Sequence, residues 1–292
     1  VVRHFDNYWN SGWAFPVHQI IKPREGAMDL QAMRDYLAAN TKPAGPRNLP
    51  ALEASWRTIA RKAHPGEPVF FSDTPAHRNP AVEEEEPNQL AAALMRLIDD
   101  ANSEVILVSA YLIPTPELES AIERAEERGV RVRILTNSLR SNNHLAAHSA
   151  YRGHLQRLVS QGADLHEVRV DAADRSLYMQ KPVQDKRLGL HAKIMIIDHN
   201  RVFVGSCNLD PRSLKLNTEV GLIIDSEPLN QDLREVLAAD FEPRNAWAVK
   251  MSEDGNLRWH GGNLVLEVQP ADSNIERLED WFLGLLPIEH QM

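Results

Sequence analysis

The fold of this chain is decided by one stretch, His191-Ala-Lys193-Ile-Met-Ile-Ile-Asp198-His-Asn-Arg201-Val-Phe-Val-Gly205-Ser206-Cys-Asn208. Residues 193–198 are apolar and β-branched at their centre, and residues 201–205 form a second short apolar run. The pair His199-Asn200 between them suits a tight turn. The stretch is therefore predicted to form a β-hairpin with strands at 193–198 and 201–205.

The polar residues of this hairpin form a pattern suited to phosphate. Side chains alternate between the two faces of a strand, so His191 and Lys193 point the same way. An imidazole and an ammonium are costly to bury without partners, but together they suit an anion. Ser206 and Asn208 add neutral donors for phosphoryl oxygens, and Gly205 lets the backbone approach closely. The set points to phosphodiester chemistry.

Two carboxylates accompany the hairpin. Glu219 lies at the start of a further strand predicted at 218–225. It is expected to hold the second nitrogen of His191, which would fix the tautomer and support a positive imidazolium. Asp198 ends the first hairpin strand, and it is either catalytic or fixes the turn.

These residues resemble the signature of the phospholipase D superfamily, in which His, Lys, Asp and a Gly-Ser-x-Asn group stand at fixed spacing and a Glu follows. Every position is filled here, by His191, Lys193, Asp198, Gly205, Ser206, Asn208 and Glu219. The flanking residues resemble the second half of bacterial cardiolipin synthase-like proteins. That likeness is carried by Leu188-Gly-Leu-His-Ala-Lys193, Gly205-Ser-Cys-Asn-Leu-Asp-Pro-Arg-Ser213, Leu216-Asn-Thr-Glu219, Tyr111-Leu-Ile-Pro-Thr-Pro116, the segment 129–138 and Leu286-Pro-Ile-Glu289.

The resemblance implies a role for each motif residue. One histidine of such a site becomes a phosphohistidine, and its counterpart acts as general acid and then as base. His191 is expected to be the acid. Lys193 and Asn208 are expected to bind the phosphoryl oxygens, with Ser206 assisting. The residues predicted to be catalytic are His191, Lys193, Asp198 and Glu219, and no cofactor is required.

The family likeness also implies that a second motif is needed, because proteins of this group bring two such histidines to one site. None of the other histidines of this chain is followed two residues later by Lys. The opening segment, Val1-Val-Arg-His-Phe-Asp-Asn-Tyr-Trp-Asn10, resembles the stretch after the first motif in two-motif proteins. We therefore expect the other histidine to come from a missing N-terminal half or from a second chain.

Neither a metal site nor a disulfide is expected. His144 and His148 are spaced like a metal-binding pair, but no third ligand accompanies them, which favours a structural or surface position. Cys207 is the only cysteine of the chain, so it cannot form an intrachain disulfide. Its expected role is that of a small apolar filler on the far face of its strand.

Composition and charge bear on the partner. The 292 residues are 43% hydrophobic, which is enough for a substantial core. The net charge of −9 argues against nucleic acid as the main partner. The acidic run at 82–87 is expected to be solvated. The basic residues before the motif either are solvated or meet lipid headgroups: Arg124, Arg128, Arg131, Arg133, Arg140, Arg152 and Arg157.

The expected location is cytoplasmic, peripheral at the bacterial inner membrane. No apolar stretch approaches the roughly 20 residues needed to span a bilayer. The amphipathic segment 275–286 either packs into the core, which is the commoner fate, or docks on a bilayer through Trp281, Phe282 and Leu285.

The predicted fold class is α/β, with a mixed, largely parallel sheet flanked by helices on both faces. Helices are expected at 88–101, 116–128, 149–161, 228–250 and 273–285. Strands are expected at 104–110, 130–136, 163–168, 193–198, 201–205 and 218–225, with a further β pair at 256–268. Residues 1–87 are predicted to be a connecting segment and linker, with helices near 27–39 and 50–62 and a strand at 68–72. Residues 88–292 are predicted to be the second phospholipase D-like catalytic half-domain.

The function implied by the resemblance is phosphatidyl transfer, or phospholipase D-type hydrolysis, through a phosphohistidine. The substrate would be a phospholipid, with phosphatidylglycerol or phosphatidylethanolamine as donor. Two alternatives stay open at this stage. One is a phosphodiesterase or nuclease that acts as a homodimer, and the other is a non-catalytic half that binds phosphate.

Overall fold

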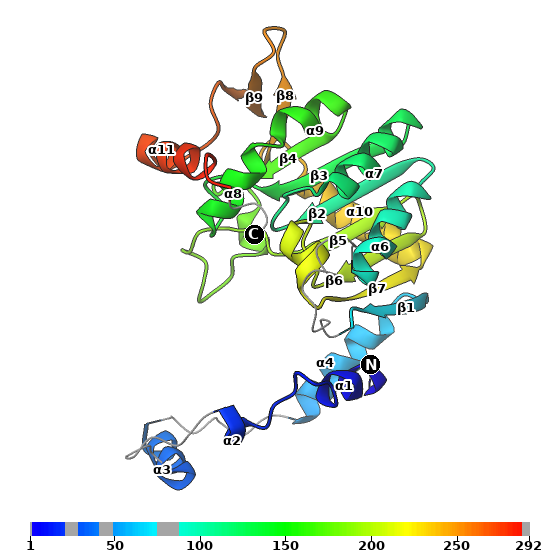
Figure 1. The fold of residues 1–292 in the computed structure, drawn as a ribbon, viewed down its shortest axis with the longest axis vertical. Helices are drawn as coiled ribbons and strands as arrows, with labels where there is room; N and C mark the ends of the chain where they lie inside the picture. Colours follow the sequence, from blue (N-terminus) through cyan, green and yellow to red (C-terminus); the bar gives the residue numbers. More distant parts are fainter. Residues whose placement is uncertain (1, 21–28, 41–48, 75–87, 288–292) are drawn as a thin grey trace. The chain divides into compact units, whose positions relative to one another are not determined.

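The computed structural model describes residues 2–20, 29–40, 49–74 and 88–287 (Figure 1). The chain divides into two compact units, residues 1–64 and residues 65–292. The boundary lies earlier than the predicted one after residue 87, because strand β1 (Glu67–Ser72) pairs with β7 (Val220–Asp225) and so belongs to the sheet of the second unit. The acidic run at 82–87 lies outside the described residues.

The described part of the first unit contains four short helices. They are α1 (Val2–Trp9), α2 (Val17–Ile20), α3 (Leu30–Asn40) and α4 (Leu49–Arg61). The helices predicted near 27–39 and 50–62 are confirmed as α3 and α4, although the expected start of the first lies outside the described residues. Among the described residues of α1, α3 and α4, none is buried.

The second unit is built on a ten-stranded mixed sheet with the order β1-β7-β6-β5-β2-β3-β4-β8-β9-β10. The remaining strands are β2 (Glu104–Ser109), β3 (Arg131–Asn137), β4 (Asp164–Val168), β5 (Lys193–Ile197), β6 (Arg201–Gly205), β8 (Ala246–Met251), β9 (Leu257–Gly261) and β10 (Leu264–Leu266). The sheet is less parallel than expected. In the described residues the strand pairs β2–β3 and β3–β4 are parallel and the other strand pairs are antiparallel, with one isolated parallel bridge between Leu112 and Leu209. Short connections account for the antiparallel pairs β5–β6, β8–β9 and β9–β10.

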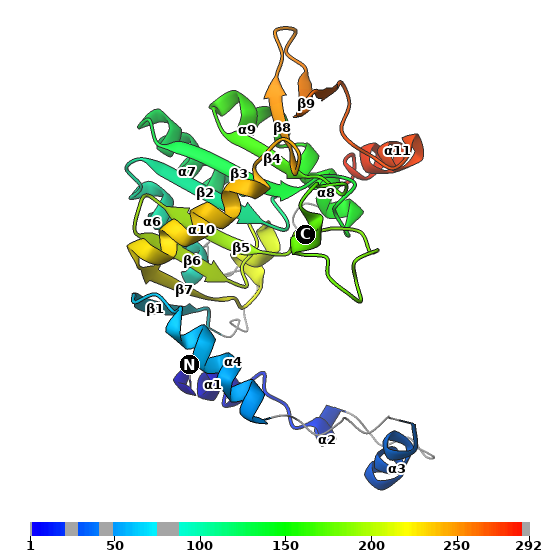
Figure 2. The same cartoon turned by 180° about the vertical axis from the view of Figure 1, so that it is seen from behind.

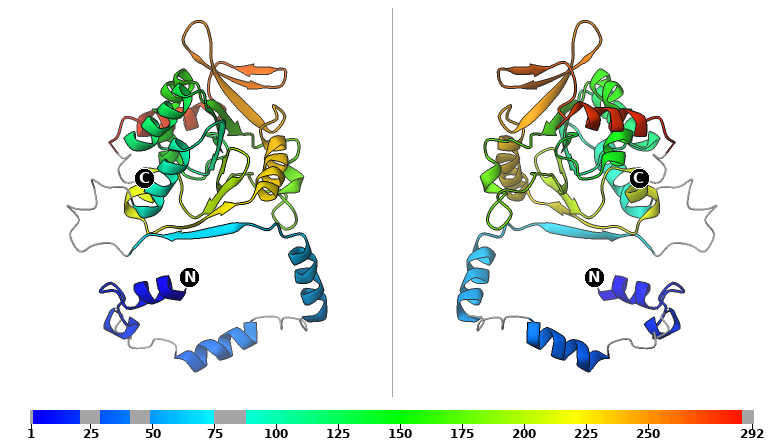
Figure 3. Two further views of the ribbon diagram at one scale, coloured as in Figure 1. Left: turned by 90° about the vertical axis from the view of Figure 1, so that its right-hand side faces the viewer. Right: turned by 90° about the vertical axis from the view of Figure 1, so that its left-hand side faces the viewer.

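Helices cover both faces of this sheet, as predicted. On one face lie α6 (Gln89–Asp99), α7 (Pro116–Glu127), α8 (Leu145–Arg152) and α9 (Leu155–Gln161), and on the other lies α10 (Glu227–Asp240). Figure 2 shows α10 in front of the sheet, and Figure 3 shows the two helical layers from the side. The strands alternate accordingly: Val105 and Leu107 pack under the first layer, and Ile106 and Val108 pack under α10.

Two helix predictions were wrong in their extent. Two helices, α8 and α9, occupy the region where one helix was expected at 149–161, because the helix is interrupted at Gly153 and His154. The helix expected at 228–250 ends at Asp240, and Ala246–Met251 forms β8, whose Trp247 and Val249 point into the core. The predicted β pair near 256–268 is confirmed as β9 and β10.

The last helix, α11 (Asn274–Leu283), packs through a polar residue and not through its apolar stripe. Asp280 is buried and accepts hydrogen bonds from Ser149 and Gln269, and it pairs with His148 at 2.8 Å. Leu278 and Trp281 remain 62% and 51% exposed. The apolar stripe of α11 therefore does not pack into the core, although core packing is the commoner arrangement for such a stripe.

Candidate functional site

The motif residues other than Asp198 lie at one end of the sheet, where the parallel strands β2 and β3 finish and β5 begins. Ser109, at the end of β2, lies opposite Lys193, the first residue of β5. His191 precedes β5 by two residues in an extended segment and is exposed. The predicted hairpin is confirmed as β5 and β6, paired from Ile194–Val204 to Ile197–Arg201.

The segment that carries His191 is held by a residue that the sequence reasoning missed. Asn137, at the end of β3, is buried; its side-chain oxygen accepts from the Leu190 backbone N–H at 2.8 Å. Its amide nitrogen donates to the Leu190 carbonyl and to the Ala110 carbonyl, both at 2.9 Å. Since this clamp ends one residue before His191, Asn137 is a positioning residue for the imidazole. The sequence does contain one sign of this role, since Asn137 directly follows the apolar strand predicted at 130–136.

Lys193 lies among acidic groups. Burial lowers the pKa of its ammonium, but the nearby carboxylates of Glu219 and Asp210 oppose that shift and favour the charged form. Its Nζ donates to the carbonyl of His191 at 3.1 Å. Asp210 is buried, which raises its pKa, and it accepts from the Ser213 backbone N–H at 2.7 Å. The lysine thus holds its charge at the edge of a partly desolvated site.

Glu219 was predicted to hold the second nitrogen of His191, but the two side chains are not hydrogen-bonded to each other. One oxygen of its buried carboxylate accepts from the Ser206 hydroxyl, and the other accepts from the Asn217 amide at 3.0 Å. Within the described ranges the imidazole of His191 has no hydrogen-bond partner. The expected contact fails because both carboxylate oxygens face β6 and the turn before β7.

The two predicted neutral donors behave differently. The Ser206 hydroxyl is already hydrogen-bonded within the protein, because it donates to Glu219 and accepts from the Val220 backbone N–H at 3.0 Å. Asn208 has a buried side-chain oxygen that finds no partner in the described part of the chain. It lines a polar cavity of about 330 Å³ together with Tyr111 and His144. Asn208 is therefore the better placed of the two to accept a hydrogen bond from a ligand hydroxyl, and its predicted contact with phosphoryl oxygens would have to use its amide nitrogen.

Asp198 lies at the opposite end of β5 from His191 and Lys193. Its carboxylate accepts from the backbone N–H groups of Asn102, Ser103 and Glu104 and from the Ser103 hydroxyl at 2.8 Å. Burial alone would raise the pKa of Asp198, but these hydrogen bonds lower it to about 2. The structure thus favours the turn-fixing alternative.

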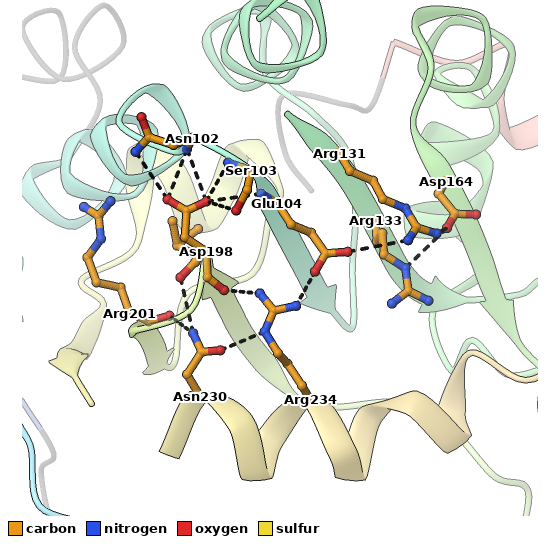
Figure 4. A network of polar contacts seen from close by, with 11 residues as sticks. Asn102, Ser103, Glu104, Arg131, Arg133, Asp164, Asp198, Arg201, Asn230 and Arg234 are labelled. Carbon is orange, nitrogen blue, oxygen red and sulfur yellow. Dashed lines mark hydrogen bonds and ion pairs between the residues drawn. The ribbon is translucent and has the colours of Figure 1, made fainter. Parts of the chain in front are cut away.

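Helix α10 secures the same turn. The Arg234 guanidinium donates to the Asp198 carbonyl, pairs with Glu104, and donates to the Asn230 side-chain oxygen at 2.7 Å. Asn230 in turn donates to the carbonyls of Ile197 and, at 3.0 Å, Arg201 (Figure 4). The hairpin is therefore fixed from its far end, and its open end carries the site.

The remaining candidate groups have structural contacts. His144 accepts from the Ala147 backbone N–H at the start of α8, and His148 is paired with Asp280. No group of three or more His, Cys, Asp or Glu side chains suited to a metal occurs among the described residues. Cys207 is buried, which raises the pKa of its thiol, and it packs in the main hydrophobic core as predicted.

Comparison with known proteins identifies the family. Residues 94–241 match the family described as cardiolipin synthase, PLD-like domain. The chain belongs to the phospholipase D superfamily. Cardiolipin synthase C of Escherichia coli (strain K12) is 30% identical over 206 residues, which are 68% of this phospholipase D-like chain and 43% of the relative. Cardiolipin synthase B of the same strain is 29% identical over 179 residues, 56% of this chain and 38% of the relative.

The chain spans less than half the length of these two relatives. Among solved structures, the phospholipase D family member Nuc from Salmonella typhimurium is similar over 59% of this chain and 93% of its own. Its sequence identity of 20% and TM-score of 0.40 are too low to bear on activity.

The basic residues before the motif are largely engaged within this phospholipase D-like unit. They form ion pairs in which Arg124 meets Asp99, Arg131 and Arg133 meet Asp164, Arg140 meets Asp272, Arg152 meets Asp280, and Arg157 meets Glu119. Arg128 donates to backbone carbonyls. These arginines therefore contact the protein itself, and their contact with lipid headgroups stays a prediction.

The described ranges contain no helix long and apolar enough to cross a bilayer. A wide hollow of about 810 Å³ lies beside α11, and Arg152, Arg258 and Arg277 line it together with Trp281. Exposed apolar side chains on this helix thus adjoin a partly basic surface.

Proposed function

We propose that this chain is the second catalytic half of a cardiolipin synthase-like enzyme. It would transfer a phosphatidyl group from phosphatidylglycerol or phosphatidylethanolamine to an alcohol, or to water. The observation that carries the proposal is the gathering of His191, Lys193 and Asn208 at one open end of the sheet, where the imidazole has no partner of its own in the described residues. A second histidine from the missing half, or from a second chain, would complete the site.

The chemistry divides between the two histidines. The second histidine attacks phosphorus, so that an N–P bond forms while the bond from phosphorus to the leaving oxygen breaks. His191 gives its proton to that leaving oxygen. In the second step His191 takes a proton from the acceptor hydroxyl, whose oxygen attacks phosphorus and frees the second histidine. Lys193 and Asn208 would offset the charge on the phosphoryl oxygens throughout.

The residues around the site would act by position. Asn137 holds the backbone one residue before His191. Glu219 would orient Ser206 and Asn217, with which it is hydrogen-bonded, and would favour the charged form of Lys193. Asp198 would stabilise the far end of the hairpin and take no part in proton transfer.

A peripheral position at the bacterial inner membrane completes the proposal. Ile275, Leu278 and Phe282 are 68%, 62% and 58% exposed on α11. The adjoining hollow carries Arg152, which is paired with Asp280, and Arg277, whose charge is complementary to anionic headgroups. We propose that an anionic bilayer surface covers this face, as for an amphipathic helix that lies in the interface.

The test uses the full-length protein that contains this chain and vesicles of phosphatidylglycerol. Cardiolipin or phosphatidic acid should form, and His191→Ala should abolish both products. His199→Ala, which alters an exposed histidine in the turn of the same hairpin, is the matched control and should retain activity. If the folded protein forms neither cardiolipin nor phosphatidic acid, the proposal is contradicted. Cleavage of DNA that depends on His191 would instead support the nuclease alternative.

A further inference from the structure

A second cavity adjoins His191 on the α10 face of the sheet. It has a volume of about 410 Å³, within the range of roughly 300–1,000 Å³ typical of small-molecule sites. The sheet, the segment before β5 and α10 supply its walls. Its lining is mainly apolar and includes Leu135, Val168, Leu190, Ile194, Leu233 and Leu237.

The polar groups around this cavity are already used by one another. The Tyr178 hydroxyl donates to Asp240 at 2.8 Å, and the Asn245 amide donates to Asp174 at 2.8 Å. Arg175 donates to backbone carbonyls, including that of Lys186 at 2.7 Å. Of the polar side chains in the lining, His191 is the one with no hydrogen-bond partner in the described ranges.

This pattern narrows the class of occupant. A nucleobase or a sugar needs donors and acceptors to match its own, and a buried polar group left unpaired is costly. Because the lining polar groups other than His191 are engaged with the protein, the cavity offers such a ligand little recognition. A hydrocarbon chain needs only apolar walls, which the cavity provides.

The polar cavity on the other face of the sheet differs from this apolar cavity in its lining. Asn208, Tyr111 and His144 line it, and Asn208 retains an unpaired oxygen there. Leu209 follows Asn208, and its backbone carbonyl accepts a hydrogen bond from the Ile113 backbone N–H at 2.7 Å. This bond holds Leu209 beside the end of β2. The apolar cavity and the polar cavity therefore flank the same end of the sheet, as the two parts of an amphipathic substrate would require.

We propose that the apolar cavity beside His191 holds an acyl chain of the phospholipid substrate, with the phosphodiester at the cavity mouth. This inference rests on the proposed function and specifies how the same site selects lipid over other phosphodiesters. It places the chain under α10 and leaves the polar cavity for the headgroup or the acceptor alcohol.

The test compares phosphatidylglycerols of increasing chain length, kept below their micellar concentrations, with glycerophosphoglycerol, which has no acyl chain. The full-length protein should gain about fourfold in kcat/KM per added methylene until the cavity is filled. Val236, which lines the cavity and is 57% exposed, can be enlarged with little change to the core. Val236→Trp should end that gain at a shorter chain, raise KM about tenfold for longer ones and leave the chain-free diester unaffected.

Ala238→Trp is the matched control, because Ala238 is exposed on the same helix and does not line the cavity. Equal kcat/KM for all chain lengths, or an equal effect of Val236→Trp on every substrate, would overturn the inference. Binding of the same lipids, measured by calorimetry, keeps it testable without turnover. Chain-dependent affinity that Val236→Trp weakens would support the cavity even if the proposed reaction fails. Affinity independent of chain length would refute it.

Discussion

Replacement of Asp198 by Asn should weaken folding and leave catalysis intact. The carboxylate accepts three backbone N–H groups and the Ser103 hydroxyl, and its pKa is lowered from 3.8 to about 2. A shift of this size corresponds to roughly 2 kcal/mol, and solvent screening of a partly exposed group reduces that to about 1 kcal/mol. Asn is the appropriate substitute because Asp198 has φ 49°, which Asn tolerates better than Ala.

The sign of the pH dependence follows from the lowered pKa. A carboxylate whose pKa is depressed in the folded state stabilises the protein above the unfolded pKa. That stabilisation is lost as pH falls from the ordinary Asp range toward about 2. The difference in unfolding free energy between wild type and Asp198→Asn should therefore be about 1 kcal/mol at pH 7 and shrink on acidification.

Urea denaturation followed by circular dichroism at pH 7 and pH 3 measures this difference. Asp185→Asn, at an exposed loop carboxylate, is the control and should leave stability unchanged. Turnover of the full-length protein at 25 °C should be the same for both variants. If Asp198→Asn unfolds at the wild-type urea concentration but loses turnover a hundredfold, the structural assignment is refuted and Asp198 is catalytic.

Three further outcomes are expected. Asn137→Ala should lower kcat about a hundredfold with little change in KM, because it frees the segment before His191. Asn137→Asp keeps an acceptor for the Leu190 N–H and should recover part of that loss, and an unchanged kcat would contradict the clamp. Cys207 should resist thiol reagents in the native protein and react only in urea, since it is buried with a raised pKa; rapid native labelling would contradict this. Leu278→Glu should reduce sedimentation with phosphatidylglycerol vesicles about tenfold, whereas Glu279→Gln should not, and equal binding would exclude α11 as the docking face.

Local patterns predicted the elements of the second unit well. The strand predicted at 104–110 is confirmed as β2, because a short apolar run flanked by polar residues has few other solutions. The helix predicted at 116–128 is confirmed as α7, with Thr115 accepting from the Leu118 backbone N–H and Pro116 in the first turn. These signals involve neighbours in sequence, so no knowledge of the tertiary fold was needed.

Tertiary choices were harder to predict. The regular alternation of helices and strands stops after β4, and beyond it the sheet grows by antiparallel pairs. Some of these join neighbouring strands, such as β5 and β6, and others join strands far apart in sequence, such as β4 and β8. The partner of Glu219 depends on the direction of a side chain at the start of β7, where Ser206 and Asn217 are nearer competitors for its oxygens. The Asn137 clamp joins residues more than fifty positions apart, and one sequence alone does not show such a contact.

The charges around Lys193 bear on how strongly this chain binds a phosphodiester in the proposed function. Lys193 is the cationic residue of the motif, and the carboxylates of Glu219 and Asp210 already interact with it. Burial raises the pKa of Asp210, and Glu219 accepts hydrogen bonds from Ser206 and Asn217. A substrate phosphate would therefore approach a cation that already interacts with two acidic side chains. A second lysine, carried with the second histidine of another motif, would supply the missing positive charge. We therefore expect a variant of the full-length protein that lacks the other motif to lose substrate binding as well as turnover.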